Sequence, residues 1–426
     1  MCGGRPLIGE VEMPTAKNSI LPILAAAMLA QGAVRIRRAP RLRDVETSMQ
    51  LLAALGCPAV RIDGDLLLAP GGPVGDTVPR PLMAAMRSSI YYLAPMLARG
   101  KRAHITFPGG CRLGERPIDL HLKGLAAMGA RIVADGDHLD CAAPDGLHGA
   151  EIHLRFPSVG ATETLLIAAA AAAGQTRIFG AAREPEVGDL AHFLIACGAR
   201  IEGVGTDRLQ VWGGALHGCE YTPIPDRITA QTVLCAAAAC GGQVLLRRAP
   251  LAPLQPMAEI LTRAGCGIRQ LGENDLVLES DGRLLGVGSL STGVYPAFAT
   301  DAGPLLAAAM LTARGDTALR ETIFSNRFGC AAQFARMGAE LDCDGRLLQI
   351  HGVPKLHGAA LTAQDLRGGA ALVIAALTAE GESRITGVDY IRRGYEDIAR
   401  LFGQLGAKIT EVCLPVHTAA SAGVSV

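Results

Sequence analysis

One loop of this 426-residue chain has the composition of a site that activates a thiol. The segment PGGCRLGERPIDLH, residues 108–121, contains three glycines, two prolines and Cys111. Glycine-rich backbone can present N–H groups to an anion, and the neighbouring Arg112 and Arg116 favour a thiolate over the ordinary cysteine pKa of about 8.5. The pattern predicts a reactive cysteine facing an anionic substrate. A loop cysteine beside arginines is also often inert, so the loop alone leaves both interpretations open.

Other polar residues could serve the same chemistry, but each also has an ordinary structural explanation. Lys17 and Asn18 precede an apolar helix, where Asn18 is typical of a helix cap. Asp301 in ATDAG is typical of an N-cap, and FPSVGATE, residues 156–163, of a turn that opens a helix. Four arginines fit surface or salt-bridge positions as well as ligand contacts: Arg87, Arg327, Arg367 and Arg393.

The elements that must position these residues form a repeat. A phrase in which a Leu- and Ala-rich helix ends at glycine and a strand follows occurs six times, at intervals of about 70 residues. Its marker glycines are predicted to end each helix in the left-handed conformation. In most copies a second glycine beside Asp or Asn predicts a hairpin turn. The six markers are Gly56, Gly129, Gly198, Gly265, Gly338 and Gly406.

A second phrase alternates with the first, and it consists of an Ala-rich helix, a glycine and a strand. Its glycines are Gly32, Gly100, Gly174, Gly242, Gly315 and Gly381. Helices with so little polar surface must be buried on most sides, so we expect an α/β fold with the helices inside and the sheets around them. Six units divide most simply into two domains of three.

The division should fall near YTPIPDR, residues 221–227, where two prolines interrupt the pattern. We therefore expect residues 17–225 to form the domain that carries the Cys111 loop. Residues 1–16 together with 226–415 form a second domain with Asp301 and Arg393, and residues 416–426 form a frayed tail. The segment GGRPLIGEVEM has no earlier repeat to join and is predicted to pair with the C-terminal unit.

Composition excludes several classes of function. The chain carries 40 basic and 40 acidic residues, so no global field attracts it to nucleic acid or to a membrane surface. No apolar run reaches the roughly 18 to 20 residues that span a bilayer, and no secretion signal is visible. We expect a cytoplasmic protein. The twelve cysteines contain no CxxC pair, which argues against a zinc site or a disulfide framework, and no cofactor is expected.

Nine stretches, in order along the chain, resemble one family, the UDP-N-acetylglucosamine 1-carboxyvinyltransferases (MurA) among the enolpyruvyl transferases. They are AKNSILPILAA, RLRDVET, MRSSI, PGGCRLGERPIDLHLKGL, FPSVGATET, YPAFATD, ETIFSNRF, DLRGGA and RRGYEDI. The resemblance implies a two-domain inverse α/β barrel of six βαβαββ repeats, three per domain. It also implies transfer of the enolpyruvyl group of phosphoenolpyruvate to the 3′-hydroxyl of UDP-N-acetylglucosamine, the first committed step of peptidoglycan synthesis.

The family's mechanism, addition followed by elimination of phosphate, gives each residue a role. Cys111 matches the general acid, which can also carry a covalent phospholactoyl adduct and is alkylated by fosfomycin. Asp301 matches the base that takes the 3′-hydroxyl proton. The resemblance places Lys17, Arg116 and Arg393 around the phosphate of phosphoenolpyruvate, with Arg327, Arg367 and Arg87 completing a cationic lining.

The nucleotide sugar is assigned to other positions of the same stretches. The uracil clamp corresponds to Arg116, Pro117, Ile118, Asp119 and Leu120, and the backbone donors to the diphosphate correspond to Ser158, Val159 and Gly160. Asn18 and Ile323 match sugar contacts. The chain departs from the family pattern at Tyr91, where some members carry Trp.

Three alternatives stand beside this interpretation, and two of them have distinct sequence signatures. The transferase that acts on shikimate 3-phosphate shares fold and donor, but it typically reads SKS where this chain has AKN, and it lacks the cysteine loop. An RNA 3′-phosphate cyclase built from the same unit would need a basic or aromatic patch. A paralogue that binds UDP-sugar without turnover fits the same motifs. The expected assembly is a monomer or a weak homo-oligomer.

Overall fold

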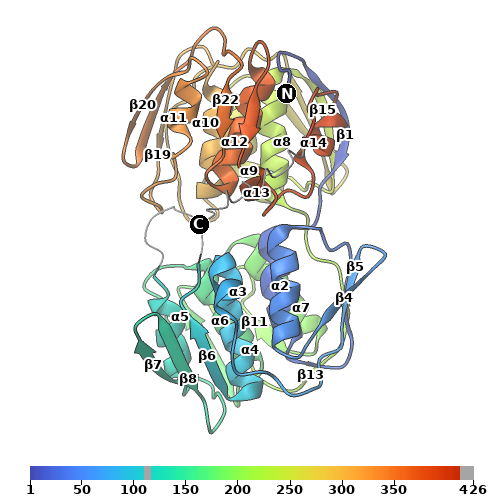
Figure 1. The fold of residues 1–426 in the computed structure, drawn as a ribbon, viewed down its shortest axis with the longest axis vertical. Coiled ribbons are helices and arrows are strands. Elements are labelled where there is room, and N and C mark those ends of the chain that lie inside the picture. Colours follow the sequence, from blue (N-terminus) through green and yellow to red (C-terminus); the bar gives the residue numbers. More distant parts are fainter. Residues whose placement is uncertain (110–116, 413–426) are drawn as a thin grey trace, which may run out of the picture.

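The computed structural model describes residues 1–109 and 117–412, and it has two lobes, one above the other in Figure 1. Each lobe has its own hydrophobic core. The lower lobe is built around buried residues between Ile20 and Leu216. The upper lobe is built around Leu7 to Met13 together with Ile228 to Leu405. Cys111, Arg112, Glu115 and Arg116 lie outside the described residues, as does the predicted tail.

The lower lobe surrounds its helices with short sheets. Its main helices are α1 (Lys17–Ala27), α2 (Arg43–Ala54), α3 (Arg80–Ala85), α4 (Leu93–Pro95), α5 (Asp119–Ala127), α6 (Val159–Ala170) and α7 (Pro185–Ala196), with the 3₁₀ helix η1 (Arg87–Tyr92) and the π-helical turn η2 (Met96–Gly100). Its first sheet has the order β14 (Glu220–Tyr221), β3 (Val34–Ile36), β5 (Asp65–Leu68), β4 (Ala59–Ile62). The second is β6 (Arg102–Thr106), β8 (His138–Ala142), β7 (Arg131–Asp135). The third is β11 (Arg200–Glu202), β12 (Arg208–Trp212), β10 (Gln175–Phe179), β9 (Glu151–His153), and β13 (Leu216–His217) pairs with β2 (Ala30–Gln31).

The upper lobe has the same plan. Its helices are α8 (Arg227–Cys240), α9 (Gln255–Arg263), α10 (Gly303–Met310), α11 (Ala331–Ala335), α12 (Leu366–Thr378), α13 (Val388–Ile391) and α14 (Ile398–Gly403), with the 3₁₀ helices η3 (Ala252–Leu254) and η4 (Thr300–Ala302). One sheet has the order β1 (Leu7–Glu12), β15 (Gly242–Arg247), β17 (Asp275–Ser280), β16 (Gly267–Leu271). A second is β18 (Gly288–Ser291), β19 (Asp316–Arg320), β21 (Leu347–His351), β20 (Glu340–Asp344), and β22 (Ala360–Thr362) pairs with β23 (Arg384–Thr386).

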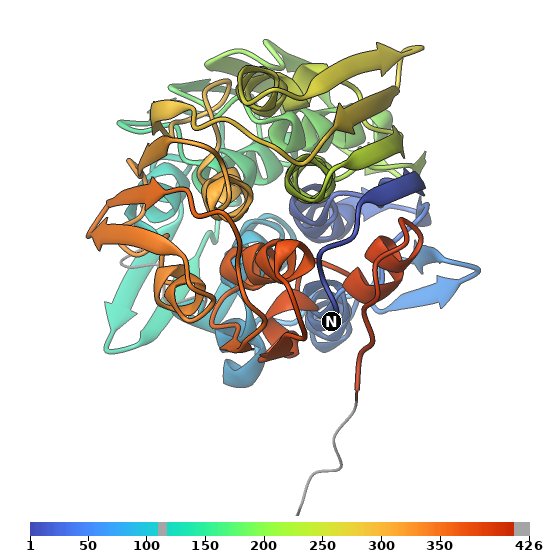
Figure 2. The same ribbon diagram turned by 90° about the horizontal axis from the view of Figure 1, so that it is seen from above.

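The Ala-rich helices are buried, as their composition predicts. Every residue of α6 from Ala161 onward is buried, and so is nearly all of α8 and α12. Alanine side chains let such helices approach closely without voids, while the sheets shield them from water. In the view from above, strands lie at the periphery and helices nearer the centre (Figure 2). The helices-inside arrangement therefore follows from side-chain size.

The glycine markers behave as the repeat predicts. All six glycines of the first phrase have positive φ, between 80° and 108°. Five of the six units continue into an antiparallel hairpin: β4–β5, β7–β8, β11–β12, β16–β17 and β20–β21. In the second phrase Gly100 lacks the positive φ of its counterparts, because the neighbouring Lys101 takes the left-handed conformation instead, with φ 59°.

We predicted that the N-terminal strand pairs with the C-terminal unit, and for the main contact of this strand the prediction is wrong. β1 pairs in parallel with β15, from Leu7 opposite Gly242 to Glu12 opposite Arg247. Among the described residues, the last unit contacts the segment without forming a ladder with it. Cys2 forms isolated bridges with Lys408 and Glu382, and the N–H groups of Gly4 and Ile8 donate to the carbonyls of Leu377 at 2.9 Å and Leu405 at 3.0 Å. Two parallel strands that lie more than 200 positions apart in the sequence leave no local signal of their pairing. The repeat pattern therefore did not reveal it.

Two chain segments cross between the lobes and pair with each other. The Ala16 N–H donates to the Ile224 carbonyl at 2.8 Å, and the Asp226 N–H donates to the Pro14 carbonyl at 2.8 Å. We call residues 14–16 and 224–226 the crossover pair. The helices α1 and α8 begin directly after its two strands, so both are fixed to the junction. No helix in the described ranges is long and apolar enough to cross a membrane.

Candidate active site

A cavity of about 640 Å³ lies between the lobes and collects most of the predicted site residues. Of the fifteen that the structure describes, all but Ile118 line it. Ile118 is 4% exposed and packs in the lower core, because it precedes α5 and turns inward. Those that line the cavity are Lys17, Asn18, Arg87, Pro117, Asp119, Leu120, Ser158, Val159, Gly160, Asp301, Ile323, Arg327, Arg367 and Arg393.

The cavity is positively charged although the chain is neutral. Seven basic and five acidic side chains line it, an excess of two positive charges. Burial also raises the pKa of the Glu184 carboxyl, which reduces its share of negative charge. The cavity is therefore suited to small anions. Three or more His, Cys, Asp or Glu side chains grouped as for a metal ion do not occur among the described residues.

The first charged cluster joins the two lobes. Asp44, in the first turn of α2, accepts two hydrogen bonds from Arg393 at 2.9 and 3.0 Å and pairs with Lys17 at 3.0 Å. Burial alone would raise the pKa of the Asp44 carboxyl, but Lys17 and Arg393 together lower it. Asp44 thus holds two cations from different lobes at one point of the cavity wall.

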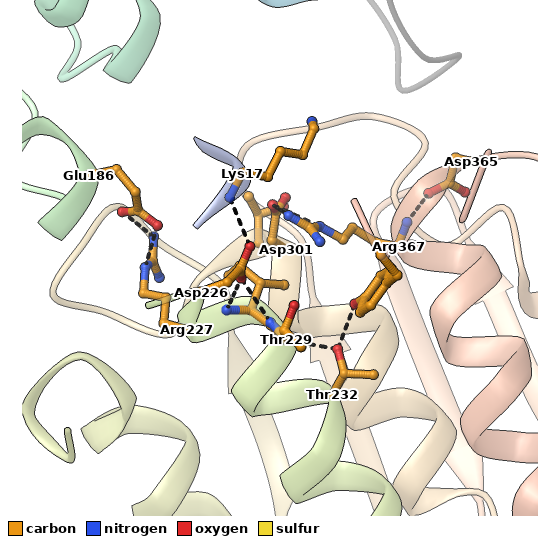
Figure 3. Close-up of polar contacts among 12 residues, drawn as sticks. Lys17, Glu186, Asp226, Arg227, Thr229, Thr232, Asp301, Asp365 and Arg367 are labelled. Carbon is orange, nitrogen blue, oxygen red and sulfur yellow. Dashed lines mark hydrogen bonds and ion pairs between the residues drawn. The ribbon is translucent and has the colours of Figure 1, made fainter. Parts of the chain in front are cut away.

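The second cluster belongs to the upper lobe alone. Asp301, in η4, pairs with Arg327 and accepts from Arg367 Nε at 3.0 Å; Figure 3 shows the Arg367 side chain reaching from α12 toward it. Against the opposing effect of burial, the two guanidiniums hold the pKa of Asp301 far below its usual range. The carboxylate is therefore ionised at neutral pH.

Two buried acidic side chains hold the backbone near this cluster in place. Asp365 caps α12 by accepting the N–H groups of Arg367 at 3.0 Å and Gly368 at 2.9 Å. Glu321 accepts the N–H groups of Ile323 at 2.7 Å and Phe324 at 3.0 Å, and it receives the Thr300 hydroxyl at 2.8 Å. This places Ile323 on the cavity wall.

The N-terminus of α6 opens into the same cavity. Ser158 caps the helix by accepting the Ala161 N–H at 3.3 Å. The first N–H groups of a helix have no carbonyl partner inside it, so those of Val159 and Gly160 can bind an anion. At Gly160 a Cβ would lie 2.9 Å from His121 Nε2, so the close approach of α5 requires glycine here.

On the side of the cavity that is predicted to bind uracil, ion pairs hold Asp119 in position. Asp119 pairs with Arg155 at 2.9 Å and with Lys123 at 3.5 Å. Arg87 donates to the Pro108 carbonyl at 3.5 Å, just before the segment outside the described residues. Pro117, just after that segment, lines the cavity.

Comparison with known proteins identifies the family of this chain. The family model of EPSP synthase (3-phosphoshikimate 1-carboxyvinyltransferase) matches residues 1–402. The UDP-N-acetylglucosamine 1-carboxyvinyltransferase 2 of Caldanaerobacter subterraneus is 43% identical over 96% of this chain and 98% of its own length. The UDP-N-acetylglucosamine 1-carboxyvinyltransferase of Acidiphilium cryptum is 44% identical over 96% of this chain and 97% of its own. The chain belongs to the UDP-N-acetylglucosamine 1-carboxyvinyltransferases.

Solved structures place this carboxyvinyltransferase in the α/β enolpyruvyl transferase fold. The enolpyruvyl transferase NikO from Streptomyces tendae matches with a TM-score of 0.85 and 24% identity, covering 96% of this chain and 97% of that one. EPSP synthase from Acinetobacter baumannii matches with a TM-score of 0.73 and 19% identity, covering 95% and 97%. At these identities the likeness establishes the fold only.

Sequence reasoning missed residues that line this carboxyvinyltransferase's cavity or hold its wall in place. Asp44 in RLRDVET and Glu321 in ETIFSNRF lay within the stretches that carried the resemblance but were not selected. Both look like ordinary helix or loop acids until the fold buries them, to 2% and 1% exposure. The ordinary explanations for two selected residues were also wrong, since Ala16 and not Asn18 caps α1, and Ala299 and not Asp301 caps η4.

Proposed function

We propose that this protein transfers the enolpyruvyl group of phosphoenolpyruvate to the 3′-hydroxyl of UDP-N-acetylglucosamine and releases phosphate. The observation that carries the proposal is that residues selected from eight separate stretches line one cavity with excess positive charge. Both substrates are anionic, and forked guanidiniums suit their phosphate and carboxylate oxygens. The shikimate 3-phosphate alternative is disfavoured, because the relatives at 43% and 44% identity carry the UDP-N-acetylglucosamine name.

The proposed chemistry divides between two side chains. Cys111, outside the described residues, protonates C3 of the enol. Asp301 accepts the proton of the attacking 3′-hydroxyl, which forms its bond to C2. Phosphate then leaves from C2 while C3 returns one proton to the Cys111 thiolate, which restores the double bond of the enolpyruvyl group. The ion pairs of Asp301 keep it ionised, as a proton acceptor must be. A substrate anion that shares Arg327 or Arg367 raises the basicity of the carboxylate by weakening those pairs.

Binding follows the same division of the cavity. Lys17, Arg393 and Arg116 take the phosphate of phosphoenolpyruvate, with Arg87, Arg327 and Arg367 nearby. The amides of Ser158, Val159 and Gly160 take the diphosphate. Pro117, Ile118, Asp119 and Leu120 take the uracil, with Ile118 acting from the core behind the wall, and Asn18 and Ile323 contact the sugar.

The finer architecture is proposed on the same basis. The repeated units correspond to six βαβαββ repeats of an inverse α/β barrel, three per domain, with the domains spanning residues 17–225 and residues 1–16 plus 226–415. The two separate cores and the crossover pair support this division. We propose that the enzyme acts in the cytoplasm at the first committed step of peptidoglycan synthesis, as a monomer or weak homo-oligomer.

Phosphate release tests the proposed function. With phosphoenolpyruvate present, phosphate should appear when UDP-N-acetylglucosamine is added and not when shikimate 3-phosphate is added. The reverse result would support the alternative transferase, and binding of UDP-N-acetylglucosamine without release would support the non-catalytic paralogue. Fosfomycin should inactivate the enzyme by alkylating Cys111, and a Cys111→Ser variant that is still inactivated would remove Cys111 from its role.

A further inference from the structure

A second cavity, of about 380 Å³, lies on the junction between the lobes. Its walls come from three places. The lower lobe contributes α7 and the loop at Val204, the junction contributes residues 224–227, and the upper lobe contributes residues 248–254. Glu184 and Arg227 line this cavity and also the substrate cavity, so one wall separates the two. We call it the junction cavity.

Most of the junction cavity is apolar. Its wall includes Val204, Ile224, Pro225, Ala230, Pro253 and Leu254. A volume of this size between lobes, with an apolar surface and charged side chains at its wall, is typical of small-molecule sites.

Two acidic side chains of the junction cavity, Asp189 and Asp226, are already satisfied by the protein, and burial raises the pKa of the third, Glu184. Asp189 accepts from the Tyr221 hydroxyl at 2.6 Å, from the Ile224 N–H at 3.1 Å and from Ser19. Asp226 accepts the N–H groups of Lys17 at 3.1 Å and of Ile228 and Thr229 at 2.8 and 2.9 Å. These carboxylates build the wall and do not call for a cationic ligand.

Arg227 pairs with Glu186 at 2.9 Å, but in the part of the chain that the structure describes the other two arginines of the cavity have no such carboxylate partner. Arg183 donates through Nε to the Gly205 carbonyl at 3.1 Å, and Arg248 donates through Nη1 to the Met13 carbonyl at 3.2 Å. Neither forms an ion pair within residues 1–109 and 117–412. Each guanidinium has five N–H groups, so both keep donors for an anion. Burial, and then the nearby Arg38, lower the pKa of Arg248, and Glu12 offsets this lowering only in part.

We propose that the junction cavity binds a small, mainly apolar carboxylic acid, with its carboxylate at Arg183 and Arg248 and its apolar body against Ile224, Pro253 and Leu254. Such a ligand touches both lobes and the crossover pair at once. Its occupancy is coupled to the substrate cavity, because Asp226 in the crossover pair holds the Lys17 N–H and Arg227 lies in the wall between the cavities. The coupling, unlike the binding, rests on the proposed function.

The test uses 2-naphthoate as probe and its uncharged amide as matched ligand, with binding measured by calorimetry on the full chain. Gly188 in α7 lines the cavity, and a Cβ there would meet only Val204 at 3.7 Å, so Gly188→Leu should fill the space and Gly188→Ala should not. We expect 2-naphthoate to bind at least tenfold more tightly than the amide. Gly188→Leu and Arg248→Gln should each weaken it at least tenfold, and Gly188→Ala less than threefold.

Equal binding by wild type, Gly188→Leu and Arg248→Gln would overturn the site. So would progressive displacement by UDP-N-acetylglucosamine without a plateau, because that would place the probe in the substrate cavity. Coupling predicts instead a several-fold shift in 2-naphthoate affinity that levels off at saturating UDP-N-acetylglucosamine. An unchanged affinity would overturn the coupling. Calorimetric binding needs no turnover, so a failure of the proposed activity would be seen separately in the phosphate assay.

Discussion

Two clusters at the substrate cavity each contain one carboxylate and two cations, but the buried and the more exposed members are reversed between them. At Asp44 the carboxylate is 3% exposed while its partners Lys17 and Arg393 are 12% and 13% exposed. At Asp301 the carboxylate is 27% exposed while Arg327 and Arg367 are 2% and 5% exposed. The first cluster therefore presents cations to the cavity, and the second presents a carboxylate. Burial decides which member of the pair can meet a substrate.

The physical consequence is a division of labour. Buried Asp44 positions two cations from different lobes, so an anion that binds them also bridges the lobes. Buried Arg327 and Arg367 hold Asp301 ionised where a hydroxyl proton can reach it. One carboxylate with two cations therefore serves substrate binding in the Asp44 cluster and proton transfer in the Asp301 cluster. Substitutions of the side chains that face the cavity, Arg393 and Asp301, should separate the two effects.

The largest effect is expected from Asp301→Asn. Loss of the proton acceptor should lower kcat by about 10² to 10⁴. Removal of one partner from a buried ion pair also costs about 3 to 5 kcal/mol in free energy of unfolding. Steady-state phosphate release gives kcat, and urea unfolding shows whether the assayed protein is folded.

Thr300→Val is the control for that substitution. It removes the hydroxyl that receives Arg327 Nε at 3.0 Å but leaves the carboxylate in place, so kcat should fall less than tenfold. A folded Asp301→Asn enzyme with wild-type kcat would show that this cluster only stabilises the lobe.

A smaller effect, on binding, is expected from Arg393→Ala. Loss of a charged hydrogen-bonding group costs about 1.5 to 3 kcal/mol, so KM for phosphoenolpyruvate should rise about 10- to 100-fold with a lesser change in kcat. Arg392→Ala is the matched control, because that neighbour is 47% exposed and pairs with Glu411 outside the cavity. A fall in kcat at unchanged KM would place Arg393 in the same class as Asp301.

The sequence predicted the fold better than it predicted this contrast. Helix ends, hairpins and buried Ala-rich helices depend on local side chains, and the marker glycines revealed them. Whether the acid of a cluster is buried or faces the cavity depends on contacts between elements that are far apart in the chain. Asp44 meets Arg393 across 349 positions, and nothing in RLRDVET indicates that contact. The pairing of β1 with β15 was hidden for the same reason.

The third carboxylate to compare is Glu163 in α6, which is fully buried and forms no ion pair within the described residues. Burial raises its pKa well above the usual range, a hydrogen bond from Tyr91 offsets this only in part, and Glu186 raises it further. A carboxyl group whose pKa is higher in the folded state costs nothing below its unfolded pKa of about 4.3, and it destabilises the fold increasingly as pH rises above that value.

Glu163→Gln removes this cost, since the amide cannot ionise. We expect the variant to exceed wild type in free energy of unfolding by about 1 kcal/mol or more at pH 8 and to match it near pH 4. Kinetic constants should change less than threefold, because Glu163 does not line the substrate cavity. The exposed Glu259→Gln should show no such pH dependence. A variant that is less stable than wild type at pH 8 would mean that Glu163 is ionised and paired in the fold, as Asp44 and Asp301 are.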